Sequence, residues 1–200
     1  MTKADLPHCP ILSLRVVELT AQHEALLQRF FDDNSEYFIA AHGEPARPDE
    51  AYREIHDEPP TGWHFTRRWV IGYLNADGSL AAMVNLVSDI LAPGVWNITT
   101  FIVATARHGS GEAQSLYQSL ENWAVSRGAR WLRLGVVQGH TRAERFWTSR
   151  GYTVVRKREG YPIGRQLNTL RVMYKPLAGG TMDEYLSLVP RDRPENAQAL

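Results

Sequence analysis

The chain has 200 residues, 44% hydrophobic and 22% charged, which is typical of a globular domain with a buried core. Its 22 basic and 22 acidic side chains cancel, which excludes a global attraction to nucleic acid or to an anionic membrane surface. The single cysteine, Cys9, excludes an internal disulfide and a paired-cysteine zinc site, and we expect no metal. Neither a signal-type segment nor an apolar run of membrane-spanning length is present, so we expect a cytoplasmic protein.

The first third of the chain predicts one strand followed by helices. Residues 13–19 are rich in Val and Leu, and Thr20 is a suitable N-cap for the helix that follows. Apolar residues recur at helical spacing as far as Ile39, and Gly43 ends the pattern. A second short helix is expected from Pro48 to about residue 55, and the prolines of residues 57–62 predict a loop.

The middle of the chain predicts an antiparallel meander and a long helix. Apolar runs at residues 69–74, 80–86 and 95–104 are separated by the turn signals of residues 75–78 and 92–94. A helix is expected over residues 110–127, closed by Gly128.

The last third predicts a parallel junction and a final pair of strands. A strand over residues 131–137 follows a helical crossover, so it should lie parallel to the strand before it. A helix over residues 141–149 and strands over 152–158 and 167–175 complete an α+β, mixed-sheet order β-α-α-β-β-β-α-β-α-β-β. The tail from Gly179 should be loose or should dock through Tyr185, Leu186 and Leu188.

A glycine turn lies between the third meander strand and the long helix, in the segment Arg107-His108-Gly109-Ser110-Gly111. A Gly-x-Gly pair alone carries little information, because about one is expected by chance in a chain of this length. Between a strand and a helix N-terminus, however, such glycines let backbone N–H groups approach an anion. The segment has neither the Lys-Ser/Thr of a P-loop nor the third glycine of a dinucleotide fingerprint.

The turn and a second segment together resemble a known family. Ala106 to Gly111 is similar to the Q/R-x-x-G-x-G/A acetyl-CoA motif of the GNAT-type N-acetyltransferases, and His140 to Tyr152 is similar to their N-x-x-A-x-x-F-Y-x-x-x-G-F stretch. The resemblance implies an N-terminal extension (residues 1–11), a GNAT-like domain (12–177) with a V-shaped opening between its fourth and fifth strands, and a C-terminal tail (178–200).

The resemblance also implies where acetyl-CoA binds as co-substrate. The pantetheine arm should lie along the backbone of Phe101, Ile102 and Val103, with a strand N–H near Ile102 or Val103 stabilising the oxyanion. Arginines 107, 142 and 145 could approach the adenosine 3′-phosphate, and His140 and Phe146 occupy motif positions. The pyrophosphate should be held by the N–H groups of His108, Gly109, Ser110, Gly111, Glu112 and Ala113.

Three positions depart from the family pattern. Ala106 replaces the usual Gln or Arg, and His140 replaces the usual Asn; His140 is equally well read as a solvated helix-start residue. Trp147 replaces the tyrosine that often protonates the leaving thiolate, and an indole N–H is a donor without being an acid. The proton would then come from water or Tyr161, with Trp147 hydrogen-bonding the sulfur or belonging to the core.

The general base and the acceptor are less defined by the sequence. Asp89, Glu36 and His42 are candidate bases, and a chain of water molecules would serve equally well. Glu36, Tyr37 and His42 are expected to form the acceptor site, which would suit a small cationic amine. These residues predict an N-acetyltransferase acting on a primary amine of a small molecule or peptide by direct attack in a ternary complex. The alternative is a non-catalytic acyl-CoA-binding regulator; the sequence also leaves a homodimer open.

Overall fold

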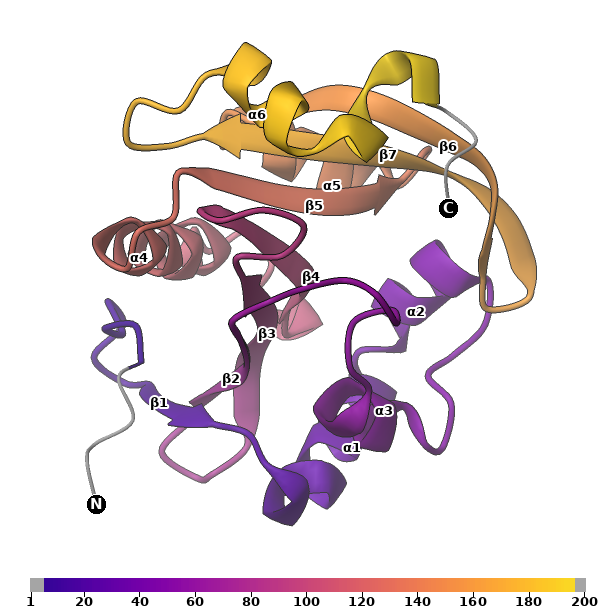
Figure 1. Ribbon diagram of the computed structural model, residues 1–200. Coiled ribbons are helices and arrows are strands. Elements are labelled where there is room, and N and C mark those ends of the chain that lie inside the picture. The colour runs from indigo at the N-terminus through magenta and orange to yellow at the C-terminus, as the bar shows by residue number, and fades with distance from the viewer. Residues whose placement is uncertain (1–5, 197–200) are drawn as a thin grey trace.

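The computed structural model describes residues 6–196, which form a seven-stranded mixed sheet covered by helices on both faces (Figure 1). The strand order is β1-β2-β3-β4-β5-β7-β6, antiparallel except for β4 and β5. The strands are β1 (Arg15–Glu18), β2 (Arg67–Leu74), β3 (Leu80–Ser88), β4 (Val95–Val103), β5 (Trp131–Val137), β6 (Thr153–Ile163) and β7 (Gln166–Pro176). The helices are α1 (Glu24–Asp33), α2 (Ser35–His42), α3 (Glu50–His56), α4 (Glu112–Ser126), α5 (Thr141–Ser149) and α6 (Met182–Leu188).

The two faces of the sheet are covered differently. One face packs on α4 and α5 through Leu116, Leu120 and Trp147, which join the largest cluster of buried side chains. The other face is covered in two parts, by α1–α3 over β2–β4 and by α6 over β5 and β7. These two parts lie apart in Figure 1, so the middle of this face, where β4 and β5 meet, is left without a covering helix.

The predicted first helix is two helices. Asn34 separates α1 from α2 with non-helical φ and ψ of −120° and 38°. Its side-chain amide donates to the carbonyl of Phe30 at 2.7 Å, and its Oδ1 accepts the N–H of Thr105 at 2.7 Å. The break therefore exists because a buried amide connects this helix to the start of the glycine turn.

The C-terminal half differs from expectation in one strand, and in the tail it follows one of the two expected alternatives. β6 continues through Ile163, so Tyr161 is paired in the hairpin rather than lying in a connecting turn. The tail docks: Tyr185 of α6 is fully buried and Leu186 packs beside it, whereas Leu188 is exposed. No helix among the described residues is both long enough and apolar enough to cross a membrane.

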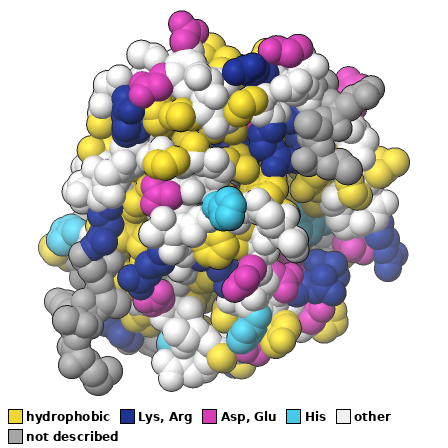
Figure 2. Space-filling model, viewed as in Figure 1, with side chains coloured by type: hydrophobic (Ala, Val, Ile, Leu, Met, Phe, Trp, Pro, Cys, Tyr) yellow, Lys and Arg dark blue, Asp and Glu magenta, His cyan; other side chains and the backbone are white. Residues whose placement is uncertain are grey.

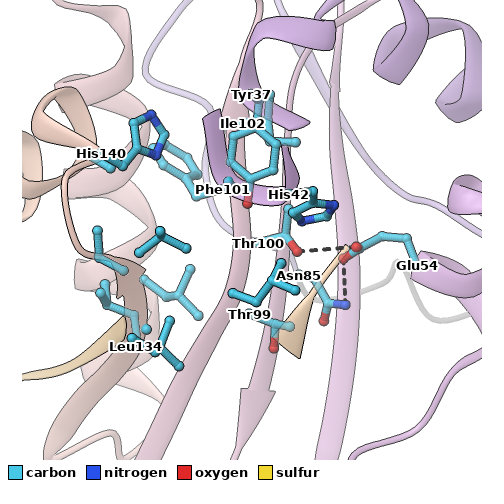
Figure 3. A pocket seen from close by; sticks show the side chains of 18 of the residues that line it. Tyr37, His42, Glu54, Asn85, Thr99, Thr100, Phe101, Ile102, Leu134 and His140 are labelled. Carbon is cyan, nitrogen blue, oxygen red and sulfur yellow. Dashed lines mark hydrogen bonds between the residues drawn. The ribbon is translucent and has the colours of Figure 1, made fainter. Parts of the chain in front are cut away.

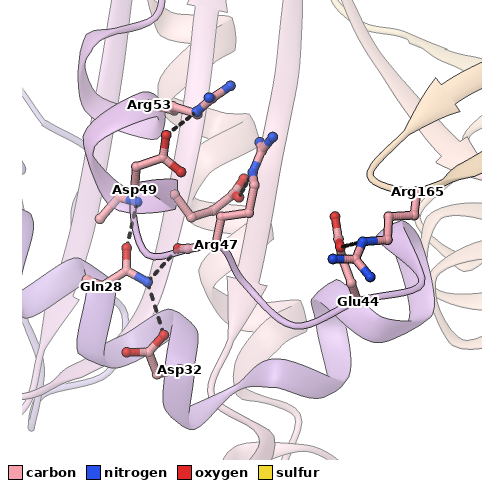
Figure 4. A network of polar contacts seen from close by, with 9 residues as sticks. Gln28, Asp32, Glu44, Arg47, Asp49, Arg53 and Arg165 are labelled. Carbon is pink, nitrogen blue, oxygen red and sulfur yellow. Dashed lines mark hydrogen bonds and ion pairs between the residues drawn. The ribbon is translucent and has the colours of Figure 1, made fainter.

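Polar contacts fix α3 and the β6–β7 hairpin against the first helices (Figure 4). Gln28 of α1 accepts the N–H of Ala51 at 3.0 Å and donates to the carbonyl of Arg47 at 2.9 Å. Arg165 of the hairpin pairs with Glu44, just beyond α2, at 2.7 Å. Both elements that border the uncovered middle of the sheet are thus held by specific contacts.

The C-terminal segment is anchored by a buried ion pair. Arg133 of β5 donates to both carboxylate oxygens of Asp192 at 2.7 and 3.1 Å, and the Tyr185 hydroxyl donates to the same carboxylate at 2.6 Å. Burial alone would raise the pKa of Asp192, but the hydrogen bonds and charge of Arg133 hold it below its usual range.

Removing one partner of this pair should therefore destabilise the fold strongly. We expect Asp192→Asn to lower the free energy of unfolding by about 3–5 kcal/mol, because Arg133 is left charged and buried. The more exposed pair Arg130–Glu184 is the control: Glu184→Gln should cost less than about 1 kcal/mol. Urea unfolding of the two variants measures both, and equal losses would contradict this assignment.

Candidate active site

The site begins where the parallel pairing of β4 and β5 stops. Their ladder runs from Val95–Trp131 to Ile98–Leu134, and the strands then diverge. A β-bulge lies at the same point, because Leu86 of β3 faces Ile98 while Asn85 faces Thr100, which leaves Thr99 as an extra residue. Beyond the bulge, β4 and β5 present facing edges that no other strand pairs.

Register defines which peptide groups face this gap. The N–H of Ala104 donates to Ala81 of β3, so by alternation the peptide groups of Val103 and Phe101 point away from β3 and into the gap. On the opposite side, the N–H of Gln138 donates to Thr169 next to β7, so the peptide groups of Gly135 and Val137 face the gap from β5. An extended ligand can therefore hydrogen-bond to backbone on either side.

A cavity of about 1000 Å³ occupies this gap and continues over the uncovered face of the sheet. His108 and Arg142 line one end, next to the glycine turn. Trp63, in the loop after α3, and Arg158, in the β6–β7 hairpin, also line the cavity. The cavity is large enough to hold the arm of an extended ligand and a second small molecule together.

The glycine turn has the geometry of an anion cradle. Gly109 and Gly111 have φ of 82° and 84°, a region that favours glycine, and an added Cβ at either would meet no other atom. The N–H groups of the first turn of α4, including that of Ala113, have no partner within the helix. The Arg107 side chain, in contrast, is engaged internally, with Glu112 at 2.6 Å and Asn75 at 2.5 Å.

His108 bridges the two sequence motifs. One ring nitrogen lies 2.9 Å from the carbonyl of Val103, and the other contacts the Arg142 guanidinium at the start of α5. Because a guanidinium only donates, Nδ1 accepts from Arg142 and Nε2–H donates to Val103. His140, at the N-cap of α5, also lines the cavity, and burial, then the nearby Arg142 charge, lower its pKa.

Aromatic side chains form the wall beneath the gap. Phe101 of β4 stacks on Phe146 of α5 with ring centroids 6.0 Å apart. Trp147 is 8% exposed and packs against Tyr117 and Tyr152 at 5.4 and 5.2 Å, so it belongs to the core while one edge reaches the cavity.

One carboxylate that the sequence analysis did not single out lies beside β4. Glu54 of α3 accepts hydrogen bonds from Asn85 Nδ2 at 2.7 Å and from Thr100 Oγ1 at 3.2 Å (Figure 3). Burial raises the pKa of Glu54 to about 7, against the lowering effect of these two hydrogen bonds and of Arg68. The side chain can thus exchange a proton near neutral pH.

The predicted acceptor residues surround Glu54. Tyr37 and His42 point into the cavity from α2, close to Glu54 in Figure 3, and Glu36 lies on the rim. Burial, then the charges of Glu54 and Glu50, raise the pKa of Tyr37, which keeps its hydroxyl protonated. Burial lowers the pKa of His42.

The remaining two predicted catalytic residues lie in different places. Tyr161 lines the cavity from the β6–β7 hairpin. Asp89 is not among the lining residues: it sits in the β3–β4 connection, where its carboxylate accepts the N–H of Gly94 at 2.8 Å. The Asp89 carboxylate stabilises this turn, and its position gives no support for a role as general base.

Glu54 was missed because its partners are distant in sequence, Asn85 by 31 residues and Thr100 by 46. A local signal existed nonetheless. Glu54 follows Ala51 by three residues and precedes Ile55, the two buried apolar positions of α3. An acidic residue beside the buried side of a short helix indicates a partner on the element beneath it.

A model of the acetyltransferase (GNAT) family matches residues 27–152. The chain therefore belongs to the GNAT family, and it is an acyltransferase that uses acetyl-CoA. No curated protein matches the chain.

Solved structures of the same family superpose over most of the chain. A GCN5-related N-acetyltransferase from Kribbella flavida is 25% identical, with a TM-score of 0.60, over 82% of this chain and 98% of that one. An acetyltransferase from Thermus thermophilus is 20% identical, with a TM-score of 0.64, over 84% and 99% of the two chains. A spermidine N-acetyltransferase from Vibrio cholerae, in complex with CoA and spermine, is 16% identical, with a TM-score of 0.60, over 87% and 98%.

The raised pKa of Glu54 predicts a pH-dependent effect on stability. The folded protein binds this proton up to about pH 7 and the unfolded chain only up to about pH 4.5, so ionisation progressively destabilises the fold between these values. We expect Glu54→Gln to be more stable than the native protein at pH 8, by about 1–3 kcal/mol, and equally stable at pH 4.

Thermal unfolding at the two pH values measures this difference. Glu159→Gln, which removes an exposed carboxylate from β6, is the control and should change stability by less than about 0.5 kcal/mol at either pH. The stability of Glu54→Gln is compared with that of the native protein at each pH. If this difference is less favourable to the variant at pH 8 than at pH 4, the raised pKa of Glu54 is wrong.

Proposed function

We propose that this protein transfers the acetyl group of acetyl-CoA to a primary amine by direct attack within a ternary complex. The observation that carries the proposal is the Glu54 carboxylate, hydrogen-bonded to Thr100 on β4 and titrating near pH 7. It lies beside the strand whose Phe101 and Val103 N–H groups face the gap, and so at the junction of the cofactor and acceptor parts of the cavity.

The cofactor is proposed to lie along the gap with its phosphates at the glycine turn. The N–H groups of Gly109, Gly111 and Ala113 suit a pyrophosphate, because they present donors and the positive end of a helix dipole. The alternating peptide groups of Phe101 and Val103 suit the amides of a pantetheine arm. Either N–H can also donate to an oxyanion next to β4.

Glu54 is proposed to act as general base. A protonated amine loses one proton to Glu54, directly or through one water, and the neutral nitrogen forms a bond to the thioester carbonyl carbon. The C–S bond then breaks, the electron pair leaves on the sulfur of CoA, and the nitrogen gives its second proton to solvent or to the departing thiolate. Glu54 suits this role because its pKa lies near the working pH. A large fraction of the carboxylate is then ionised, and it is still basic enough to take a proton from the amine.

The leaving sulfur needs little help, since a thiolate of pKa about 8.5 is a tolerable leaving group at neutral pH. Tyr161 and solvent are the proposed proton sources, because Tyr161 lines the cavity and Trp147 is largely buried among aromatic rings.

The cofactor assignment predicts the effect of a charge in the glycine turn. Gly109→Asp should weaken CoA binding at least about tenfold, because a carboxylate would stand against the pyrophosphate. Gly179→Asp is the matched control, with a φ of 78° against 82° and equally open surroundings, and should bind CoA normally. Calorimetric titration with CoA measures both, and equal affinities would refute the phosphate site.

The base assignment predicts the pH profile. With a panel of primary amines and free thiol release as the readout, kcat/KM should change slope near pH 7 in the native protein. Glu54→Gln should lose this break and about 10²–10⁴-fold in kcat/KM. Glu159→Gln is again the control.

Two results would decide against the proposal. CoA binding without thiol release on any amine would favour the non-catalytic regulator. A Glu54→Gln variant with unchanged rate and pH profile would remove Glu54 as the base while leaving the transferase activity in place.

A further inference from the structure

The side of the cavity formed by β5 and β6 carries arginine side chains. Arg133 of β5 and Arg158 of β6 line it, and Arg156 follows on the same side of β6 as Arg158. Arg191, from the segment after α6, lies against Trp63 of the cavity wall, with its guanidinium carbon 4.1 Å from the ring centroid. Figure 2 shows a group of Lys and Arg side chains in the upper right part of the face in view.

Within this arginine cluster (Arg133, Arg156, Arg158 and Arg191), the carboxylate that pairs with Arg133 is already engaged. Asp192 is fully buried and accepts from Arg133 and from the Tyr185 hydroxyl. The Arg158 guanidinium rests on the Tyr161 ring, 4.5 Å from its centroid, and pairs with no described carboxylate. In Arg191, Nε and Nη2 are buried and have no acceptor among the described residues.

The charges of the cluster act on one another. Burial, then the charge of Arg133, lower the pKa of Arg191, and Arg158 adds to the effect while Asp192 opposes it. Neighbouring guanidinium groups that repel one another form a site where an anion is favoured.

The opposite wall of the same cavity carries the carboxylate that titrates near pH 7. Glu54 and Glu50 of α3 both line it, and Glu50 is paired with Arg47 at 3.0 Å. Glu54 is left to receive a proton from the acceptor amine, as proposed above. The cavity next to β4 therefore has a proton-accepting wall on α3 and a cationic wall on β5 and β6.

We propose that the acceptor is a small amino acid-like molecule whose carboxylate binds at Arg158 while its amine faces Glu54. The proposal rests on the proposed transferase function and names its substrate class. Glu36, Tyr37 and His42 alone predict an acceptor that carries only a positive charge. These residues form one wall of the cavity, and the proposal adds a carboxylate that faces the other wall. Arg158 is the residue of choice for testing, since Arg133 is tied to Asp192 in the fold.

The test compares α-amino acids with their carboxamides as acceptors, because each pair differs in the negative charge; the accompanying difference in amine pKa is the same for the native protein and the variant. The native protein should use the acids with a kcat/KM at least about tenfold higher, the effect of one charge-assisted contact. In Arg158→Gln this preference should fall to about unity. Lys157→Gln removes an exposed charge from the other side of the same strand and should keep the preference.

A binding measurement separates this proposal from the transferase itself. N-acetyl amino acids and their amides are titrated calorimetrically into the CoA-saturated protein and its Arg158→Gln variant. Selective binding of the carboxylates that Arg158→Gln abolishes supports the subsite, even if no amine releases thiol and the transferase proposal fails. Turnover with equal use of acids and amides, or a preference that survives in a folded Arg158→Gln, overturns it.

Discussion

Four residue pairs of parallel ladder join the two halves of the sheet, and the site exists because the pairing then stops. Had β4 and β5 remained paired, the peptide groups of Phe101, Val103, Gly135 and Val137 would satisfy one another. Their divergence leaves polar backbone facing a cavity, which is tolerable only where a ligand or water can bind. The bulge at Thr99 and the helices α4 and α5 behind the gap hold the strands in this arrangement.

On the sheet face opposite α4 and α5, the helices α1–α3 and α6 cover two separate parts. The uncovered strip between them lets the cavity continue beyond the gap between β4 and β5. α3 is fixed to α1 through Gln28 and to the sheet through Glu54, so the proposed base is also a structural contact. This dual role has an energetic consequence. The fold is less stable when Glu54 is ionised than when it is protonated, although the ionised form is the one that can act as base. The C-terminal segment, anchored by Arg133 and Asp192, closes the opposite side with arginine. The cavity therefore combines backbone, acid and cation from segments far apart in the chain.

The sequence predicts those features of the fold and the site that depend on interactions between residues close together in the chain. The glycine turn, α4 and the motif at α5 were predictable because capping, glycine φ and helical periodicity are local. The break at Asn34 was not, since it depends on a hydrogen bond to Thr105, 71 residues away. The same reason hid Glu54, and Asp89 was favoured as a candidate base although its carboxylate serves a turn. The arginine cluster likewise joins β5, β6 and the last helical turns, which no local pattern relates.

The central claim is that the gap between β4 and β5 holds the acyl donor, and amide hydrogen exchange tests it residue by residue. In the free protein, the amide of Ile102 should be protected because it pairs with β3, whereas the amides of Phe101 and Val103 should exchange readily. Saturation with acetyl-CoA should slow exchange at Phe101 and Val103 and leave Ile102 unchanged. Unchanged exchange at Phe101 and Val103 in the saturated protein would contradict the account.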